Sequence, residues 1–343
     1  MAINLASKYS DQIAEVFTRA SFIKGKTAET YDLTGVKTLK VYTPITVEEV
    51  DYDRDGGLKR YGDVTEMQDV VQELTMTQDK AFTLTIDKGN NLDQNLVKNA
   101  ADMLRLQLNE KSTPAADKYA FKRFVTMAGS IVESAKPTKA NIISKIADAS
   151  QALDDALVPD DNRYLYLTSE MYKLVCTSDE FAGVDVLARQ SIAKGVCGAV
   201  FGTTVVRVPK SYLPEDVYFL VAHKDAVLMP YKIADAKVHE DPVGVSGALI
   251  EGRHYYDAYV LGAKCGGVYA LVDEDCRSSA PTISQGKITA FGKVRYTLDG
   301  SDPRYSDSAK DYVAGTVLTP ETGCKIRAYC VQSGAYPSEV AEG

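Results

Sequence analysis

The residues best placed to do chemistry lie in one acidic stretch, DYDRDGGLKRYGD, in which Asp51, Asp53 and Asp55 alternate and Gly56 follows. Alternating carboxylates followed by a glycine open the calcium-binding loop of an EF-hand. An EF-hand also needs flanking helices and a bidentate Glu at its twelfth position, whereas here strands are expected on both sides and the twelfth position is Gly62. We therefore interpret the stretch as the solvated tip of a β excursion, where charge and glycine discourage edge pairing.

The other candidate groups match no catalytic pattern. His223 stands two residues before Asp225, as in part of a catalytic triad, but no activated nucleophile motif accompanies the pair, so a structural histidine is expected. The glycine-rich stretch KGVCGAVFG fits neither the phosphate loop nor the dinucleotide-binding fingerprint. The six cysteines match no metal-binding spacing. We therefore expect no enzyme activity, no cofactor and no metal site.

The composition is that of an ordinary globular protein: 343 residues, 45% hydrophobic and 25% charged, with a formal net charge of -8. The negative charge argues against a generally basic nucleic-acid-binding protein. No apolar run approaches the roughly 20 residues of a membrane span, and the N-terminus lacks the features of a signal peptide, so we expect a cytoplasmic origin. The 21 tyrosines suit interfaces, because a tyrosine is apolar along its ring and polar at its tip.

The elements that must position these residues form a mixed α+β chain, without the regular alternation of a doubly wound sheet. Alternating β-branched residues over 36–87 predict a long two-stranded excursion with the acidic stretch at its tip. An apolar stripe that begins near Asn91 predicts a long helix, and Thr113 and Pro114 indicate that a helix restarts there. After Asp275 the sequence becomes rich in Ser, Pro and Gly, which indicates a boundary before a small all-β unit.

The order of segments in 1–273 resembles that of the major capsid protein of tailed bacteriophages, whose fold is named after phage Hong Kong 97 (the HK97-like capsid fold). The resemblance is carried by RYGDV…FTLTIDKGNNLDQ…PAADKYAFKRF, by NIISKIADASQALDDALVPDDNRYLYLTSEMYKLV, and by GAVFGTTVVRVPKSYLP and GRHYYDAYVLGAKCGGVYAL. It implies an N-terminal arm (1–35), an extended β loop (36–87), a peripheral domain with a spine helix (88–136), an axial domain (137–250), and a return to the peripheral domain with a linker (251–277).

The C-terminal stretch 278–343, with VRYTLDGSDPRYS and IRAYCVQSGAYPSEVA, resembles the small Ig-like domain at the C-terminus of chitobiase-type glycosidases. The shared residues are Tyr296, Thr297, Asp299, Gly300, Asp302, Pro303, Ala328 and Ser338. In such proteins the domain is an accessory module without catalytic residues, and Ig-like modules on capsid proteins are displayed on the outer surface. A linker of Ser and Pro residues suggests that few contacts cross the boundary.

The capsid resemblance implies a structural subunit that self-assembles through hexamers and pentamers into an icosahedral head around phage double-stranded DNA. The expected location is the virion, and the host cytoplasm during assembly. A portal and a separate scaffolding protein would be partners, the DNA would be contacted non-specifically, and the Ig-like domain would take a glycan or a decoration protein. No membrane is expected to be involved.

The extended-loop tip, with Asp53, Asp55, Lys59 and Arg60, is the expected contact with a neighbouring subunit. Some members of the family join their subunits by an isopeptide bond between a loop lysine and an asparagine in a neighbour's peripheral domain. Lys59 is the candidate lysine, but no asparagine follows Asn162, so a non-covalent shell is expected.

Two other functions remain open from the sequence. An encapsulin-like compartment has the same fold but encloses proteins, and nucleic acid inside natural particles would distinguish a phage head from it. A carbohydrate-binding or glycosidase-associated protein would carry the chitobiase-like module, although no recognisable pair of catalytic carboxylates is present.

Overall fold

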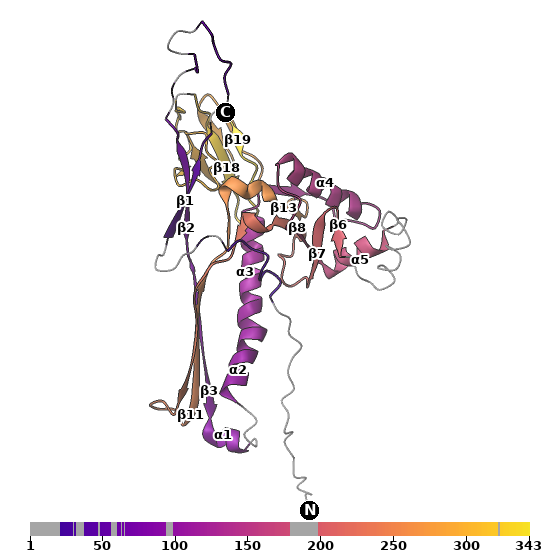
Figure 1. Ribbon diagram of the computed structural model, residues 1–343, viewed down its shortest axis with the longest axis vertical. Helices are drawn as coiled ribbons and strands as arrows, with labels where there is room; N and C mark the ends of the chain where they lie inside the picture. The colour runs from indigo at the N-terminus through magenta and orange to yellow at the C-terminus, as the bar shows by residue number, and fades with distance from the viewer. Residues whose placement is uncertain are drawn as a thin grey trace, which may run out of the picture.

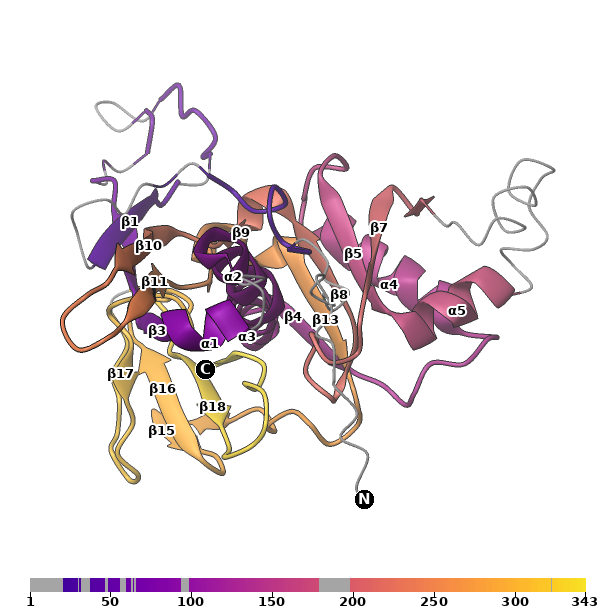
Figure 2. The same cartoon turned by 90° about the horizontal axis from the view of Figure 1, so that it is seen from below.

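The centre of the fold is a six-stranded mixed sheet between two layers of helix (Figures 1 and 2). The computed structural model describes residues 21–29, 31, 38–46, 49–55, 60–62, 64, 66–93, 99–178, 198–321 and 323–343. The strands run in the order β4 (Ser130–Glu133), β13 (Val268–Val272), β8 (Val217–His223), β5 (Arg163–Thr168), β7 (Thr203–Val208) and β6 (Ala199–Val200). β4 is parallel to β13 and β5 is parallel to β7, whereas the other neighbours are antiparallel.

Helices cover both faces of this sheet. α3 (Thr113–Thr126) places Phe121 and Phe124 on one face, where they pack with β8 and β13 residues and with Phe22 of the N-terminal segment. α4 (Ile142–Asp155) and α5 (Ser169–Thr177) cover the other face with a second core that includes Ile146 and Met171. β13 is buried along its whole length, as expected for a strand that is covered on both sides.

α3 is the last part of one long helix, which starts with α2 (Ala100–Gln107) and continues through a π-helical stretch, η1 (Leu108–Ser112). The side chain of Asn99 accepts a hydrogen bond from the amide of Ala101 and so caps the start. An α-helix does begin at Thr113 with Pro114 in its first turn, as expected, but Thr113 is not a cap, because it has helical backbone angles and continues the π-helical stretch without a break. A short helix, α1 (Lys88–Asp93), precedes it.

The extended loop is built differently from the sequence expectation. β1 (Thr38–Pro44) and β2 (Asp69–Thr75) do form an antiparallel hairpin. β3 (Gln78–Asp87), however, pairs with β11 (Gly247–Tyr256), which in turn pairs with β10 (Tyr231–Glu240). These three strands run alongside α2, away from the hairpin (Figure 1). The excursion over 36–87 is therefore divided between two sheets.

The C-terminal unit, residues 278–321 and 323–343, contains strands but no helix among these described residues. Val294, Ile326, Ala328 and Cys330 are the centre of its own small core. The unit comprises a hairpin, β14 (Thr282–Ser284) with β15 (Lys287–Thr289), and a sheet in the order β17 (Lys310–Asp311), β16 (Lys293–Thr297), β18 (Arg327–Val331) and β19 (Ala341–Glu342).

Short elements complete the body and lie near the base of the extended loop. They are η2 (Lys224–Ala226), β9 (Val227–Leu228), β12 (Tyr259–Val260) and η3 (Gly262–Gly267), with β9 paired to β12. None of the helices in the described part of the chain combines the length and the apolar character that a membrane span needs.

We expect Phe121→Ala to destabilise the subunit by about 3–5 kcal/mol, because a fully buried ring between helix and sheet leaves a cavity when truncated. Urea unfolding followed by circular dichroism measures the change. The exposed neighbour Lys122→Ala is the control and should change the free energy of unfolding by less than about 0.5 kcal/mol. Equal effects of the two substitutions would contradict the placement of α3 on the sheet.

Candidate subunit-contact site

The tip of the extended loop, residues 45–67, projects from one end of the molecule (Figure 1). Asp53, Asp55 and Arg60 are exposed there, whereas Lys59 lies outside the described residues. The amide of Asp53 donates to the carbonyl of Arg60 at 3.1 Å, and the amide of Asp55 donates to the Asp53 carboxylate at 2.9 Å. The structure thus joins the backbone of Asp53 to that of Arg60, and both charged side chains are exposed.

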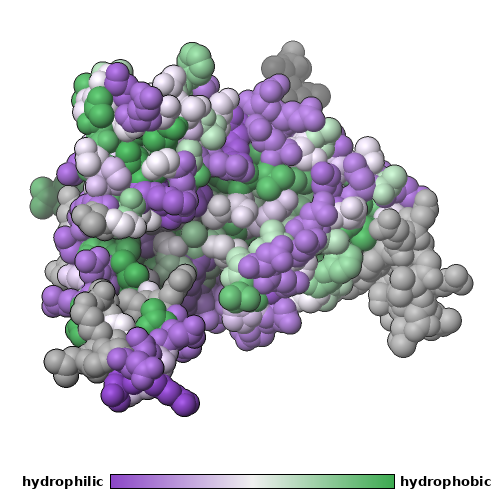
Figure 3. Space-filling model, turned by 90° about the horizontal axis from the view of Figure 1, so that it is seen from above, coloured by the Kyte–Doolittle hydropathy of each residue, from purple (hydrophilic) through white to green (hydrophobic). Residues whose placement is uncertain are grey.

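The loop tip also exposes large apolar side chains, which the sequence interpretation missed. Tyr61 is 85% exposed and Val64 is fully exposed, and the rings of Tyr52 and Tyr61 meet edge to face with centroids 5.0 Å apart. The exposed set on the loop comprises Tyr42, Ile45, Val50, Tyr52, Tyr61, Val64 and Met67. Seen from above, this end of the molecule shows hydrophobic and hydrophilic side chains side by side (Figure 3). A concentration of exposed apolar groups is typical of a protein contact surface.

The acidic stretch lacks the geometry of a metal site in the part of the chain that the structure describes. The Asp53 carboxylate is engaged by the amide of Asp55, as in a turn. Among the described residues, no group of three or more His, Cys, Asp or Glu side chains is placed to hold a metal ion. His223 has a structural contact: its Nδ1 accepts a hydrogen bond from the backbone amide of Asp225, at 3.2 Å, and so opens the turn of η2.

The base of the loop is fixed to the body by apolar and polar contacts. Leu74 packs with Leu228, Tyr259 and Leu261. The buried amide of Gln72 donates to the carbonyl of Val260 at 2.9 Å and accepts from the amide of Gly262 at 2.8 Å. Because both polar groups of Gln72 are satisfied by backbone, the side chain fixes the position of β2 against β12.

A buried carboxylate, Asp257, holds the point where β2 passes into β3. It accepts hydrogen bonds from the amide and hydroxyl of Thr77, both at 2.8 Å, and from the Tyr119 hydroxyl at 2.7 Å. The amide of Ala258 also donates to it at 2.7 Å. Asp257 thus binds Thr77, which lies between β2 and β3, at the point where the chain leaves the hairpin and β3 begins to pair with β11.

The Ig-like motif residues form a tight turn over 299–306, at the edge of the C-terminal unit. The Asp299 carboxylate accepts from the hydroxyls of Ser301 and Ser308, at 2.6 and 2.7 Å. Burial raises the pKa of Asp299, but these hydrogen bonds outweigh it, so the pKa is lowered overall. Gly300 has φ +76°, a left-handed conformation that favours glycine. Thr297 is buried and donates to the carbonyl of Ser301.

The remaining motif residues have equally local contacts. Tyr296 packs on the core of the C-terminal unit and meets Tyr312 edge to face, and Pro303 is buried. Asp302 forms an ion pair with Arg304 at 2.8 Å. The motif therefore builds the turn.

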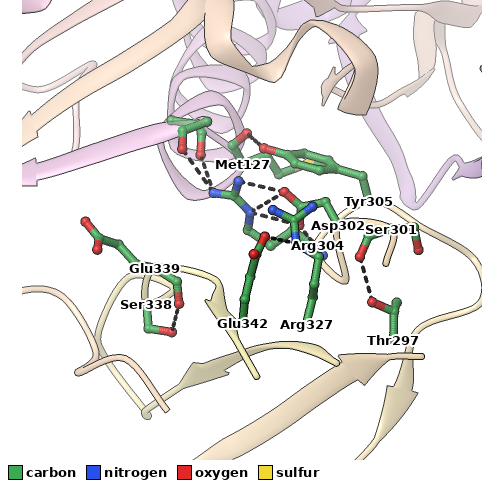
Figure 4. Close-up of polar contacts among 12 residues, drawn as sticks. Met127, Thr297, Ser301, Asp302, Arg304, Tyr305, Arg327, Ser338, Glu339 and Glu342 are labelled. Carbon is green, nitrogen blue, oxygen red and sulfur yellow. Dashed lines mark hydrogen bonds and ion pairs between the residues drawn. The ribbon is translucent and has the colours of Figure 1, made fainter. Parts of the chain in front are cut away.

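The expectation that few contacts cross the boundary at 278 is wrong. The turn presents Arg304 and Tyr305 to the C-terminal end of α3 (Figure 4). Arg304 Nη1 donates to the carbonyls of Ala128 and Gly129, at 3.3 and 3.1 Å, and the Tyr305 hydroxyl donates to the carbonyl of Met127 at 2.7 Å. Tyr305 is only 6% exposed and belongs to the main core. The apolar residues at strand spacing indicate a core within the unit, but no feature of the sequence predicts this contact with α3.

The N-terminal segment is anchored to α3 by a second buried carboxylate, Asp117. It accepts from the hydroxyl of Ser21 at 2.7 Å and from the amide of Phe22 at 2.8 Å. Burial raises the pKa of Asp117, and the hydrogen bonds from Ser21 and Phe22 offset this only in part. Residues 1–20 of the expected arm lie outside the described residues.

A groove of about 1140 Å³ lies beside this anchor, between the segment 21–31, the long helix, and strands β3 and β10. Its lining is aromatic and basic. The aromatic side chains are Tyr31, Phe82, Tyr119, Tyr231 and Tyr256, and the lysines are Lys24, Lys80 and Lys111; among the described residues of the lining, Glu29 is the one acidic residue. An acidic segment with exposed apolar side chains would match this lining in charge and hydropathy.

Solved phage structures share the fold. A structure described as Mycobacterium phage Che8 matches with a TM-score of 0.65 at 16% identity, covering 79% of this chain and 98% of that chain. The capsid structure of cyanophage P-SCSP1u matches with a TM-score of 0.64 at 13% identity, over 79% and 93%. The mature capsid of bacteriophage PhiM1 gives 0.62 at 13%, over 80% and 93%. The predicted α+β class is confirmed, and the chain has the fold of phage capsid structures.

No family model and no curated protein matches the sequence of this chain.

The anchor at Asp117 predicts a pH dependence of stability. Because the pKa in the folded protein is raised above the ordinary value of 3.8, the stabilising contribution is present at low pH and is lost as the pH rises through the folded pKa. The free energy of unfolding of the wild type, relative to Asp117→Asn, should fall as the pH rises from about 4 and then level off.

Urea unfolding of both proteins between about pH 4 and 7 measures this difference. Asp155→Asn, which removes an exposed carboxylate at the end of α4, is the control. Wild-type and Asp117→Asn curves that stay parallel across the range would contradict the assignment.

Proposed function

We propose that this chain is a major capsid protein, the subunit of an icosahedral shell that encloses phage double-stranded DNA, and not an enzyme. One observation carries the proposal: about four fifths of the chain has the fold of phage capsid structures, and it spans nearly the whole of those chains. The exposed apolar loop tip supports it, since such a surface calls for a neighbouring copy. The location that follows is the virion, after assembly in the host cytoplasm.

The contact that builds the shell is proposed to join the loop tip of one copy to the groove of a neighbour. Residues 45–69 contain eight acidic and three basic residues, whereas the groove is lined by three lysines and one glutamate. Apolar side chains on both surfaces would be buried together, and the opposite charges would orient the approach. Asp53, Asp55, Lys59 and Arg60 are the proposed contact residues of the tip.

The HK97-like division into arm, extended loop, peripheral domain and axial domain is proposed for the same reason. Hexamers and pentamers, a portal and a separate scaffolding protein are the partners that this architecture requires. The C-terminal unit is proposed to be an Ig-like domain on the capsid exterior. Its size supports this, because the capsid structures leave about a fifth of the chain unmatched. A glycan or a decoration protein is its proposed ligand.

The neighbours do not favour the encapsulin-like or carbohydrate-active alternatives, since those named for an assembly are phage capsids. Negative-stain electron microscopy of the purified protein, with nuclease-resistant DNA assayed in particles from the natural source, tests the proposal. Closed shells that contain DNA are expected. Particles filled with protein, or a chain that stays monomeric under all assembly conditions, would overturn it.

Removing the apolar groups of the tip should impair assembly but leave the fold intact. We expect the double variant Tyr61→Ser and Val64→Ser to keep its circular dichroism spectrum and to assemble at least about tenfold less at equal concentration, because each lost apolar contact costs about 1 kcal/mol or more. Sedimentation velocity measures the assembled fraction. Val243→Ser, at an equally exposed position in the turn between β10 and β11, is the matched control.

Reversing charge at the tip is an independent test. Lys59→Glu with Arg60→Glu should give a folded subunit that assembles poorly, because both side chains are proposed contact residues and their reversal would set glutamates against acidic groups of the neighbour, such as Glu29 of the groove. A chelator should leave both the fold and the shell unchanged. Normal shells from the charge-reversed protein would show that the tip is not a contact.

A further inference from the structure

The C-terminal unit touches the extended loop itself, as well as the body. Ser306 forms an antiparallel bridge with Gln72, and the amide of Asp307 donates to the carbonyl of Val71 at 2.9 Å. Asp307 also reaches Lys40 on β1, with 3.5 Å between the charged groups. The turn thus adds a short strand-like contact to the edge of β2 that β1 leaves open.

Gln72 connects this contact to the body. Its backbone bridges Ser306, and its side chain binds the carbonyl of Val260 and the amide of Gly262. Two segments that are far apart in sequence, 306–307 and 260–262, therefore hold the same residue of β2 from two directions.

The adjoining residues fix the turn to the end of the long helix. Arg304 and Tyr305 bind the carbonyls of Met127, which is the C-cap residue of α3, and of the two residues that follow it, Ala128 and Gly129. A guanidinium at this end also interacts favourably with the helix dipole. Burial raises the pKa of the Tyr305 hydroxyl, so it remains protonated and able to donate.

The fit is close because glycine occupies the facing position. A Cβ at Gly262 would lie 2.7 Å from the Cβ of Tyr305 and 3.0 Å from its Cγ. Gly262 has an ordinary negative φ, so an alanine there would be disfavoured by the clash and not by its backbone conformation.

Contacts within the turn itself fix the direction of Arg304. The Asp302 carboxylate binds the amide of Arg304 at 2.9 Å and its guanidinium at 2.8 Å, which aims the arginine at the helix end. Two further contacts join this region to the body: the Tyr336 hydroxyl of the unit donates to Asp216 at 2.9 Å, and the amide of Arg277, in the linker, donates to Glu133 at 2.8 Å.

We propose that the C-terminal unit acts as an intramolecular clamp, which holds the base of the extended loop at a fixed angle to the long helix. The turn 299–307 is the clamping element: its Arg304 and Tyr305 bind the end of α3, and its Ser306 and Asp307 bind β2. This role does not depend on whether the unit also binds a ligand.

Hydrogen–deuterium exchange of the unassembled full-length chain tests the clamp from both sides. The double variant Arg304→Ala and Tyr305→Ala removes the contact from the turn, and Gly262→Ala displaces Tyr305 from the body without altering the C-terminal unit. In both variants we expect the amides of 70–74 to exchange about tenfold faster or more, because β2 loses its restraint. The amides of β16 and β18 should keep their wild-type rates.

Gly198→Ala is the control, since a Cβ there meets nothing within 4 Å and should leave exchange in β2 unchanged. Unchanged exchange of 70–74 in the Gly262→Ala protein, or faster exchange of β16 and β18 without any change in β2, would overturn the clamp. The measurement uses the free subunit, so its outcome is separate from the proposed capsid function. A chain that never forms shells can still show the clamp, and a shell-forming chain can lack it.

Discussion

A buried carboxylate at the junction of three elements determines much of this architecture. Asp257 is 1% exposed and accepts four hydrogen bonds, from both donors of Thr77, from Tyr119 and from Ala258. Removal of a charge from water is costly unless the lone pairs are satisfied, and here donors from the loop, the long helix and the returning strand satisfy them together. None of these three elements can move away without leaving the carboxylate short of partners, so the extended loop and the long helix are fixed relative to one another.

The sequence predicted most of the elements but fewer of their pairings. Phe82, Leu84 and Ile86 alternate as a strand should, and they do lie in β3. Alternation says which residues share a face, but not which edge they join, and the partner of β3 lies about 170 residues further along the chain. Pro114 is a similar case: its first-turn position was predicted, but the helical stretch η1 that runs directly into α3 was not.

At the candidate site, too, the sequence predicted which residues are charged but not which groups they contact. The charged side chains of Asp53, Asp55 and Arg60 were predicted to be exposed at a tip, and all three are exposed in the structure. The apolar residues Tyr61 and Val64 were overlooked, since in a strand-rich stretch such residues are expected to face a core. Arg304 and Tyr305 were missed for another reason: their acceptors are backbone carbonyls, and a backbone acceptor leaves no signature in the sequence. A core, by contrast, is recorded in the side chains of both partners: Val294, Ile326 and Ala328 are apolar at strand spacing and pack together in the C-terminal unit.

The exposed loop tip also bears on how subunits behave before they meet. Each chain carries a net charge of -8, and acidic residues are interspersed in sequence with the apolar residues of the tip. Like-charged chains repel one another over about 10 Å at 0.1 M ionic strength, whereas apolar contact acts only at short range. Salt therefore shortens the range of the repulsion between whole chains and leaves apolar contact intact, while it screens the proposed pairing of the acidic tip with the lysines of the groove. Under the proposed shell function, ionic strength would thus act in opposite directions on the approach of two subunits and on the orientation of their contact.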